Sequence, residues 1–358
     1  MRSRFIKILA LLAVLSLVAT ACSSGDSTEA SDTTTTTDAT TTTTEATNQP
    51  TEVGIAVVFA GVKEEPWYST MLEALDRVSA ASPHGLKVNY EWFESIAYAD
   101  GERVLGELAA SGKYDIIIGH SIFGESIAPL QDQYPDILFA FSGSGNDPLG
   151  GNGYWIDVYT HEAAYLTGII AGMMTKTNKI SAVAAFPFPN VNLPLNAYIA
   201  GALSVNPDVE AQVTYIESWF DPTTAKESAL AQIAAGADIV YAERLGPFEA
   251  AAESDGVLAF GHFSDQAALA PEVVLTSTLA IWDPAVNTLI DEWFAYVTEG
   301  KAYDAPMERI LFLMSKGGTD LAALSDLVPD DVKAAVEEAK AKILSGELEV
   351  PFNDAPIE

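Results

Sequence analysis

From residue 51 onward, apolar runs suited to buried strands alternate with segments of helical periodicity. The strand-like runs are apolar at consecutive positions, as in 53–59, which is typical of parallel strands covered on both faces. The segments between them space apolar residues three and four apart, as with Met71, Leu75 and Val78. Strands are predicted at 53–59, 86–93, 114–119, 137–141, 179–186, 212–216, 239–241, 257–261 and 273–277. Helices are predicted at 66–81, 98–111, 126–134, 160–174, 192–205, 222–235, 246–254 and 285–298. This order predicts an α/β fold with doubly wound parallel sheets.

The alternation of predicted strands and helices occurs once over the first part of the chain and begins again near residue 160. Two α/β lobes, with the chain crossing between them at a hinge, account for this restart. One large α/β enzyme domain is the alternative. We expect the first lobe to comprise 51–142 and 279–305, and the second to comprise 143–278 and 306–352.

The N-terminal segment has the order of a secretory signal. Basic residues precede an apolar run at 8–18, and small residues lead into Cys22, the single cysteine of the chain. The run is too short to span a bilayer, which takes about 20 residues. A cysteine directly after small residues resembles the bacterial lipobox, although Ala19 replaces the usual Leu or Val. We therefore expect 1–21 to be a lipoprotein signal peptide and Cys22 to be acylated. An ordinary signal peptide with an incidental cysteine is the alternative.

Composition adds two constraints. Residues 22–50 are rich in Thr with scattered acidic residues, so this stretch is expected to be a disordered tether. The net charge of −32 repels nucleic acid and anionic lipid surfaces, which excludes a phosphate-backbone partner. No further apolar run has the length of a membrane span. Acylation of the only cysteine leaves none for a disulfide, so the stability of the fold depends on a packed core.

Enzyme motifs are poor matches. The run 119–124 resembles a nucleophile elbow, but Phe123 occupies the place of the last glycine. The glycines at 143–145 lack the dinucleotide-binding spacing, and there is no P-loop. The four histidines are scattered without metal-ligand spacing. The adjacent carboxylates Glu64 and Glu65 are interpreted as solvated capping charges. No catalytic residue, metal or cofactor is predicted.

Aromatic residues follow several predicted strands, where ligands bind in open α/β sheets. Trp67, with Tyr68 beside it, follows the first strand, and Trp219 and Trp282 follow later ones. Indole rings at such positions provide flat surfaces on which a planar ligand can stack. Phe248 lies in another such loop. The alternative is that each ring packs in the core or at the lobe interface.

Two polar residues complete the candidate site. Asp265 follows the strand at 257–261 and could accept hydrogen bonds from a ligand, or it could cap a helix. Asn196 lies after Pro187 and Pro189, where its amide could contact a base edge or remain solvated.

Several motifs together resemble one family, the basic membrane protein (BMP) family of solute-binding lipoproteins. They are the lipobox, Gly168-x-x-Ala171-Gly172-Met173, Gly201-Ala202-x-x-Val205-Asn206-Pro207-Asp208, Gly236-Ala237-Asp238, Gly261-x-x-Ser264-Asp265-Gln266 and Ser345-Gly346-Glu347-Leu348. The resemblance covers residues 53–352. It implies a type I periplasmic-binding-protein-like fold and an ABC permease and ATPase as partners. It also implies a purine nucleoside, a purine base or a riboflavin-like molecule as ligand.

Positions that depart from the family pattern bear on the ligand. Trp67-Tyr68 corresponds to the family's first-loop aromatic, and Asp265 to the second of two aspartates, the first being Phe263 here. Ala280 replaces a lysine that is common in nucleoside receptors, whereas Trp282 resembles the base-binding members. These differences weaken ribose recognition but retain stacking, so a purine-like base is the expected ligand. A ligand-sensing receptor and a purine nucleoside-processing enzyme remain as alternatives.

Overall fold

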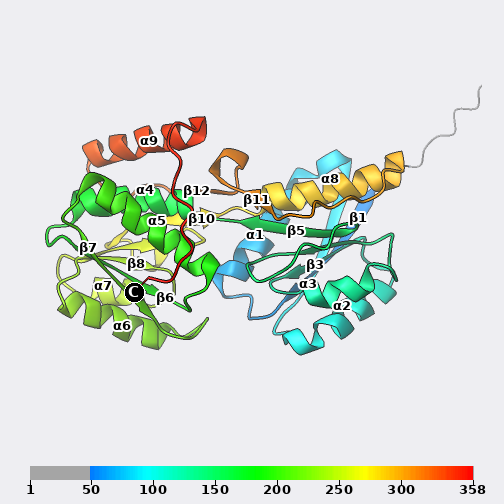
Figure 1. Cartoon of the computed structure of the whole chain (residues 1–358), viewed down its shortest axis with the longest axis horizontal. Helices are drawn as coiled ribbons and strands as arrows, with labels where there is room; N and C mark the ends of the chain where they lie inside the picture. Colours follow the sequence, from blue (N-terminus) through cyan, green and yellow to red (C-terminus); the bar gives the residue numbers. More distant parts are fainter. Residues whose placement is uncertain (1–48, 358) are drawn as a thin grey trace, which may run out of the picture. The chain divides into compact units, whose positions relative to one another are not determined.

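The computed structural model describes residues 49–357, which contain two six-stranded sheets, each with helices on both faces (Figure 1). The signal peptide, Cys22 and nearly all of the expected tether lie outside the described residues. The first sheet has the order β11-β5-β4-β3-β1-β2 and the second the order β12-β10-β9-β8-β6-β7. Neighbouring strands are parallel except β12, which pairs antiparallel with β10. The predicted fold class is confirmed.

The elements have the following bounds. The strands of the first sheet are β1 (Glu52–Phe59), β2 (Lys87–Phe93), β3 (Ile116–His120), β4 (Leu138–Phe141), β5 (Gly153–Val158) and β11 (Ile310–Phe312). The strands of the second sheet are β6 (Lys179–Ala184), β7 (Glu210–Tyr215), β8 (Ile239–Ala242), β9 (Leu258–Gly261), β10 (Val274–Ala280) and β12 (Thr319–Leu321). The helices are α1 (Pro66–Ala81), α2 (Gly101–Ala110), α3 (Gly124–Ile127), α4 (His161–Met174), α5 (Pro189–Val205), α6 (Pro222–Ala234), α7 (Pro247–Ala252), α8 (Asp283–Glu299) and α9 (Asp330–Ser345).

Successive side chains of a strand point to opposite faces of the sheet, so each lobe has one hydrophobic core on each face of its sheet. On β1, Val53, Ile55 and Val57 pack with α1 and α8, while Ala56 and Val58 pack with α2 and α3. The second sheet is arranged in the same way, with α4, α5 and α9 on one face and α6 and α7 on the other. Burial of both faces explains why these strands read as continuous apolar runs.

The chain crosses between the two lobes three times in the described region. The first crossing lies between β5 and α4, the second between β10 and α8, and the third between β11 and β12. Each lobe is therefore built from separated parts of the sequence, and the crossings form the predicted hinge region.

The expected lobe boundaries are wrong at two strands. β5 falls in the range assigned to the second lobe, yet it pairs with β4 in the first sheet. β11 likewise pairs with β5, although 306–352 was assigned to the second lobe. β5 was not predicted because Asp157 interrupts its apolar run, and β11 and β12 are only three residues long each.

Candidate functional site: a pocket between the two lobes

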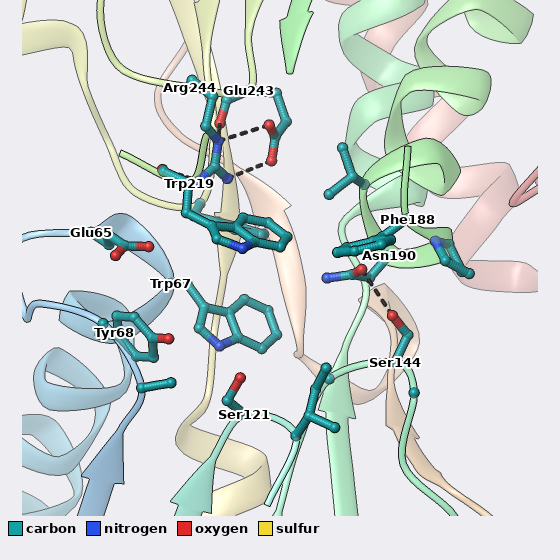
Figure 2. A pocket seen from close by; sticks show the side chains of 18 of the residues that line it. Glu65, Trp67, Tyr68, Ser121, Ser144, Phe188, Asn190, Trp219, Glu243 and Arg244 are labelled. Atoms are coloured by element: carbon teal, nitrogen blue, oxygen red, sulfur yellow. Dashed lines mark hydrogen bonds and ion pairs between the residues drawn. The ribbon is translucent and has the colours of Figure 1, made fainter. Parts of the chain in front are cut away.

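A pocket of about 380 Å³ lies where loops at the carboxyl ends of strands from both sheets meet (Figure 2). From the first lobe it is lined by residues that follow β1, β2, β3 and β4, and from the second by residues that follow β6, β7, β8 and β9. Its volume falls in the range of about 300–1,000 Å³ that is usual for small-molecule sites. Parallel sheets bind ligands at this edge because the loops there converge.

The first turn of α1 supplies the pocket wall of the first lobe. Pro66 begins the helix, where its fixed φ is favourable and its missing N–H costs no hydrogen bond. The helix start at Pro66 places Glu65, Trp67 and Tyr68 side by side after β1, and all three line the pocket. The expectation that Trp67 and Tyr68 face a cleft therefore agrees with their positions, and their contact with a ligand stays a prediction.

Trp67 is held in place by a buried imidazole. The indole of Trp67 stacks on His120 with ring centroids 5.1 Å apart and planes only 4° from parallel. His120 Nε2 lies 3.0 Å from the carbonyl oxygen of Trp67, and Nδ1 lies 2.9 Å from Ser142 Oγ. Nε2 must carry the proton to bond a carbonyl, so Nδ1 accepts from the serine. Burial lowers the pKa of His120 to about 4, which keeps the ring neutral. One face of Trp67 is thus backed by a fixed, uncharged ring.

A second aromatic group faces the pocket from the other lobe. Trp219 contacts Phe186, with centroids 5.1 Å apart, and Phe188, with centroids 5.8 Å apart. Trp219 and Phe188 line the pocket and are 40% and 46% exposed, so each ring still has surface to offer a ligand. Figure 2 shows the indoles of Trp67 and Trp219, one from each lobe, among the residues that line the pocket.

A charged pair lies next to Trp219 and also lines the pocket. Arg244 donates to both carboxylate oxygens of Glu243, from Nε at 2.8 Å and from Nη2 at 2.5 Å. Arg244 Nη1 also donates to the carbonyl oxygen of Trp219 at 2.9 Å, and the guanidinium carbon lies 5.7 Å from the Trp219 ring centroid. The Ala185 amide donates to Glu243 as well. Arg244 thereby fixes the loop that carries Trp219.

Glu65 is the acidic group of the opposite wall. Its side chain is only 8% exposed, and burial raises its pKa, an effect that the positive charge of Arg244 partly opposes. Because ionisation of this carboxyl is disfavoured by burial, a ligand N–H that bonds to it stabilises the charged form.

Trp282 and Phe248, both expected in the cleft, lie in the core instead. β10 extends three residues beyond the predicted strand, so Trp282 falls in the second crossing, fully buried. It contacts Trp67 and His120 edge to face and supports the pocket from behind. Phe248 is 1% exposed because α7 turns it into the core of the second lobe. The expected cleft positions of both residues are wrong.

Asp265 and Asn196 are also placed elsewhere. Asp265 is exposed and accepts a hydrogen bond from the Ala267 amide at 3.1 Å, a local turn bond, and the short helix that follows at Ala267–Leu269 has Gln266 at its N-cap, so Asp265 does not cap it. Phe263 occupies the pocket side of this loop in a left-handed backbone conformation with φ of 67°. Asn196 lies within α5, because this helix begins at Pro189, and its amide donates to the carbonyl oxygens of Asn353 and Ala355. The cleft roles of both residues are therefore wrong.

Several pocket residues were missed by sequence reasoning. The interpretation of Glu65 as a solvated cap is wrong because the loop after β1 turns its side chain inward, where it is buried and lines the pocket. The remaining missed polar residues follow strands, and the same rule that selected the tryptophans could have found them. They are Tyr98, Ser121, Ser144, Asn190, Glu243 and Arg244.

Two further observations bear on the type of site. Between residues 49 and 357, no group of three or more His, Cys, Asp or Glu side chains is arranged to hold a metal ion. Over the same span, no helix has both the length and the apolar character needed to cross a membrane.

The amino-acid sequence is similar to that of known solute-binding proteins. Residues 52–354 match the Bmp family, described as "ABC transporter substrate-binding protein PnrA-like". The "Putative ABC transporter glucose-binding protein TsgA13" of Haloferax volcanii is 31% identical over 262 residues, which is 73% of this chain and 64% of that protein. The "Purine-binding protein BAB2_0673" of Brucella abortus is 30% identical over 274 residues, or 75% of this chain and 74% of that protein.

Solved structures agree on the fold. A solute-binding protein of an ABC transporter system from Aeropyrum pernix superposes with a TM-score of 0.69 at 22% identity. It covers 84% of this chain and 94% of its own. Because the match to the Bmp family spans residues 52–354, the chain belongs to the Bmp family of ABC transporter substrate-binding proteins.

Proposed function

We propose that this protein is the receptor of an ABC importer and that it binds a flat, purine-like heterocycle between its two lobes. The observation that carries the proposal is the Trp67 indole, which is backed by the neutral His120 ring and lines the pocket together with Trp219 of the other lobe. Stacking of a base on an aromatic side chain contributes about 1–3 kcal/mol and suits any flat heterocycle. The relative from Brucella abortus, whose printed name refers to purine binding, supports the same class.

Closure of the lobes would complete the site. The pocket takes residues from both lobes, so neither lobe alone can surround a ligand. The three crossings permit a hinge motion that brings the walls together, as in other two-lobed receptors. A ligand that contacts both walls shifts the population toward the closed state.

Calorimetry and tryptophan fluorescence test the proposal. The protein is titrated with adenine, guanine, adenosine, riboflavin, glucose and leucine. We expect tight binding of at least one heterocycle, together with a change in tryptophan emission, because Trp67 and Trp219 line the pocket. Binding of glucose or leucine with no heterocycle bound would exclude the purine class and leave the receptor role in place.

We also propose that residues 1–21 are removed and that Cys22 anchors the protein to the outer face of the cell membrane through its tether. Two or more acyl chains make such anchoring stable. Cys22 is the only cysteine, so thioether-linked label can be assigned to it. Metabolic labelling with a tagged fatty acid should mark the wild type and not Cys22→Ser, which should be released. Equal labelling of both proteins would rule out the anchor.

A further inference from the structure

The guanidinium of Arg244 has donors left over at the pocket. A guanidinium carries five N–H groups. Nε donates to Glu243, Nη2 donates once to Glu243, and Nη1 donates once to the carbonyl oxygen of Trp219. One N–H on each terminal nitrogen thus has no acceptor among residues 49–357. The side chain is only 8% exposed and lines the pocket. Buried charged donors that lack a partner are costly, so a bound molecule that supplies acceptors gains affinity here.

The charged and amide groups of the two walls that are left for a ligand differ in kind. The second lobe contributes donors, namely Arg244 and the amide of Asn190, whose oxygen is already occupied by Ser144 Oγ at 2.9 Å, while both oxygens of Glu243 are occupied by Arg244. The first lobe contributes Glu65, whose ionised carboxyl only accepts, beside the hydroxyls of Tyr68, Tyr98 and Ser121. Figure 2 shows Glu65 on one side of the two indoles and Asn190 on the other, with Arg244 next to Trp219. A matching flat ligand has neighbouring acceptors on one edge and an N–H on another.

We infer that the pocket selects a 6-oxopurine over a 6-aminopurine, with Arg244 and Glu65 as the specificity-determining residues; this inference rests on the proposed purine-like ligand. A 6-oxopurine presents O6 and N7 as adjacent acceptors, the pair that an arginine contacts through two N–H groups. Its N1–H group can donate a hydrogen bond to the carboxylate of Glu65. Adenine presents a donor at N6 beside N7, and its N1 is an acceptor that faces a carboxylate unfavourably.

Hypoxanthine and adenine form the matched pair for the test, because they differ at position 6 and in the proton on N1. Calorimetry on the wild-type protein should give hypoxanthine about 5- to 150-fold tighter binding, the usual discrimination of a good two-bond arginine contact. Equal or tighter binding of adenine overturns the inference while leaving the proposed function intact. If neither base binds and no other heterocycle does, the proposed function itself fails.

Two variants assign the preference to its residues. Arg244→Lys keeps a cation next to Glu243 but loses the planar fork of N–H groups. The affinity for hypoxanthine should therefore fall at least fivefold, and the ratio of the hypoxanthine and adenine affinities should approach one. Glu65→Gln adds a hydrogen-bond donor toward N1 of the base. The affinity for hypoxanthine should therefore fall, while the affinity for adenine should stay the same or rise. Thermal unfolding of both variants confirms that they fold. A preference for hypoxanthine that survives in both folded variants rules out these two residues as its source.

Discussion

Ser144 Oγ donates a hydrogen bond of 2.9 Å to Asn190 Oδ1. Ser144 lies in the loop after β4 of the first lobe, and Asn190 lies in the first turn of α5 in the second. Both residues line the pocket, so this bond joins the two lobes directly beside the ligand space. It is a contact that opening of the lobes has to break.

Ser144→Ala should therefore speed ligand release. A hydrogen bond of this kind contributes about 0.5–1.5 kcal/mol, which corresponds to a dissociation rate about 2- to 13-fold faster. Stopped-flow fluorescence measures that rate, and thermal unfolding should change little. Ser204→Ala is the control, because Ser204 bonds only within α5, to the carbonyl oxygen of Gly201. Identical release rates in Ser144→Ala and the control would show that the bond does not hold the lobes.

Removal of the indole platform should weaken binding without unfolding the protein. Trp67→Ala should cost about 1–3 kcal/mol in binding free energy, the value of one stacked base. Trp92→Ala is a matched control, since Trp92 is 42% exposed on β2 and does not line the pocket. Calorimetry compares the two variants. Equal affinity in both would assign Trp67 to packing rather than to ligand contact.

The close contact between α4 and α5 should not tolerate a methyl group. A Cβ on Gly168 would lie 2.0 Å from the carbonyl oxygen of Tyr198, so Gly168→Ala must push the helices apart. Such overpacking costs about 1–3 kcal/mol of unfolding free energy. Gly106→Ala on α2 meets only an ordinary contact at 3.4 Å, and the better helix propensity of Ala should stabilise the protein by up to about 1 kcal/mol. Urea unfolding should give opposite signs for the two variants, and a common sign would contradict the packing argument.

The contribution of Asp157 to stability should fall as pH rises from about 4 to about 7. Asp157 is fully buried, and its nearest cation, Arg309, lies 3.6 Å away, so burial raises the pKa of Asp157 to about 7. In the unfolded chain this pKa is about 3.9, so Asp157 binds its proton more tightly in the folded protein than in the unfolded chain. The stabilisation that this difference provides is present below about pH 4 and is lost as the pH rises toward about 7.

Asp157→Asn keeps the shape of the side chain without the titration. The unfolding free energy of the variant, relative to wild type, should rise over the same interval, by about 1.4 kcal/mol for each pH unit at which the two states differ by a full proton. Urea unfolding at a series of pH values measures this. Parallel pH profiles for the two proteins would mean that Asp157 is not responsible.

Local pattern predicted the regular elements well. The helix predicted at 66–81 has those bounds in the structure, because its apolar spacing and Pro66 at its start both act within the segment. The short edge strands β11 and β12 were not predicted, since three residues carry no periodicity and their pairing depends on distant strands. The helix α9 was also missed.

The candidate site was predicted in part, for a similar reason. Position after a strand correctly brought Trp67, Tyr68 and Trp219 to the pocket. The same rule misplaced Trp282, because the length of β10 depends on its pairing with β12, which supports three more residues of strand. Burial of Glu65 likewise depends on how the loop after β1 folds against Gly61, and no apolar periodicity indicates that.

The three crossings between lobes have a consequence for how the chain acquires its structure. The first lobe contains β1 to β5 near the start of the sequence but also α8 and β11, which end at residue 312. Because the chain is synthesised from its N-terminus, the first sheet lacks its edge strand β11 and its covering helix α8 until most of the protein has been made. An N-terminal lobe that could fold on its own would do so first. Here the two lobes have to finish folding together, so a truncated chain ending before α8 leaves the core around Val53 and Ile55 uncovered.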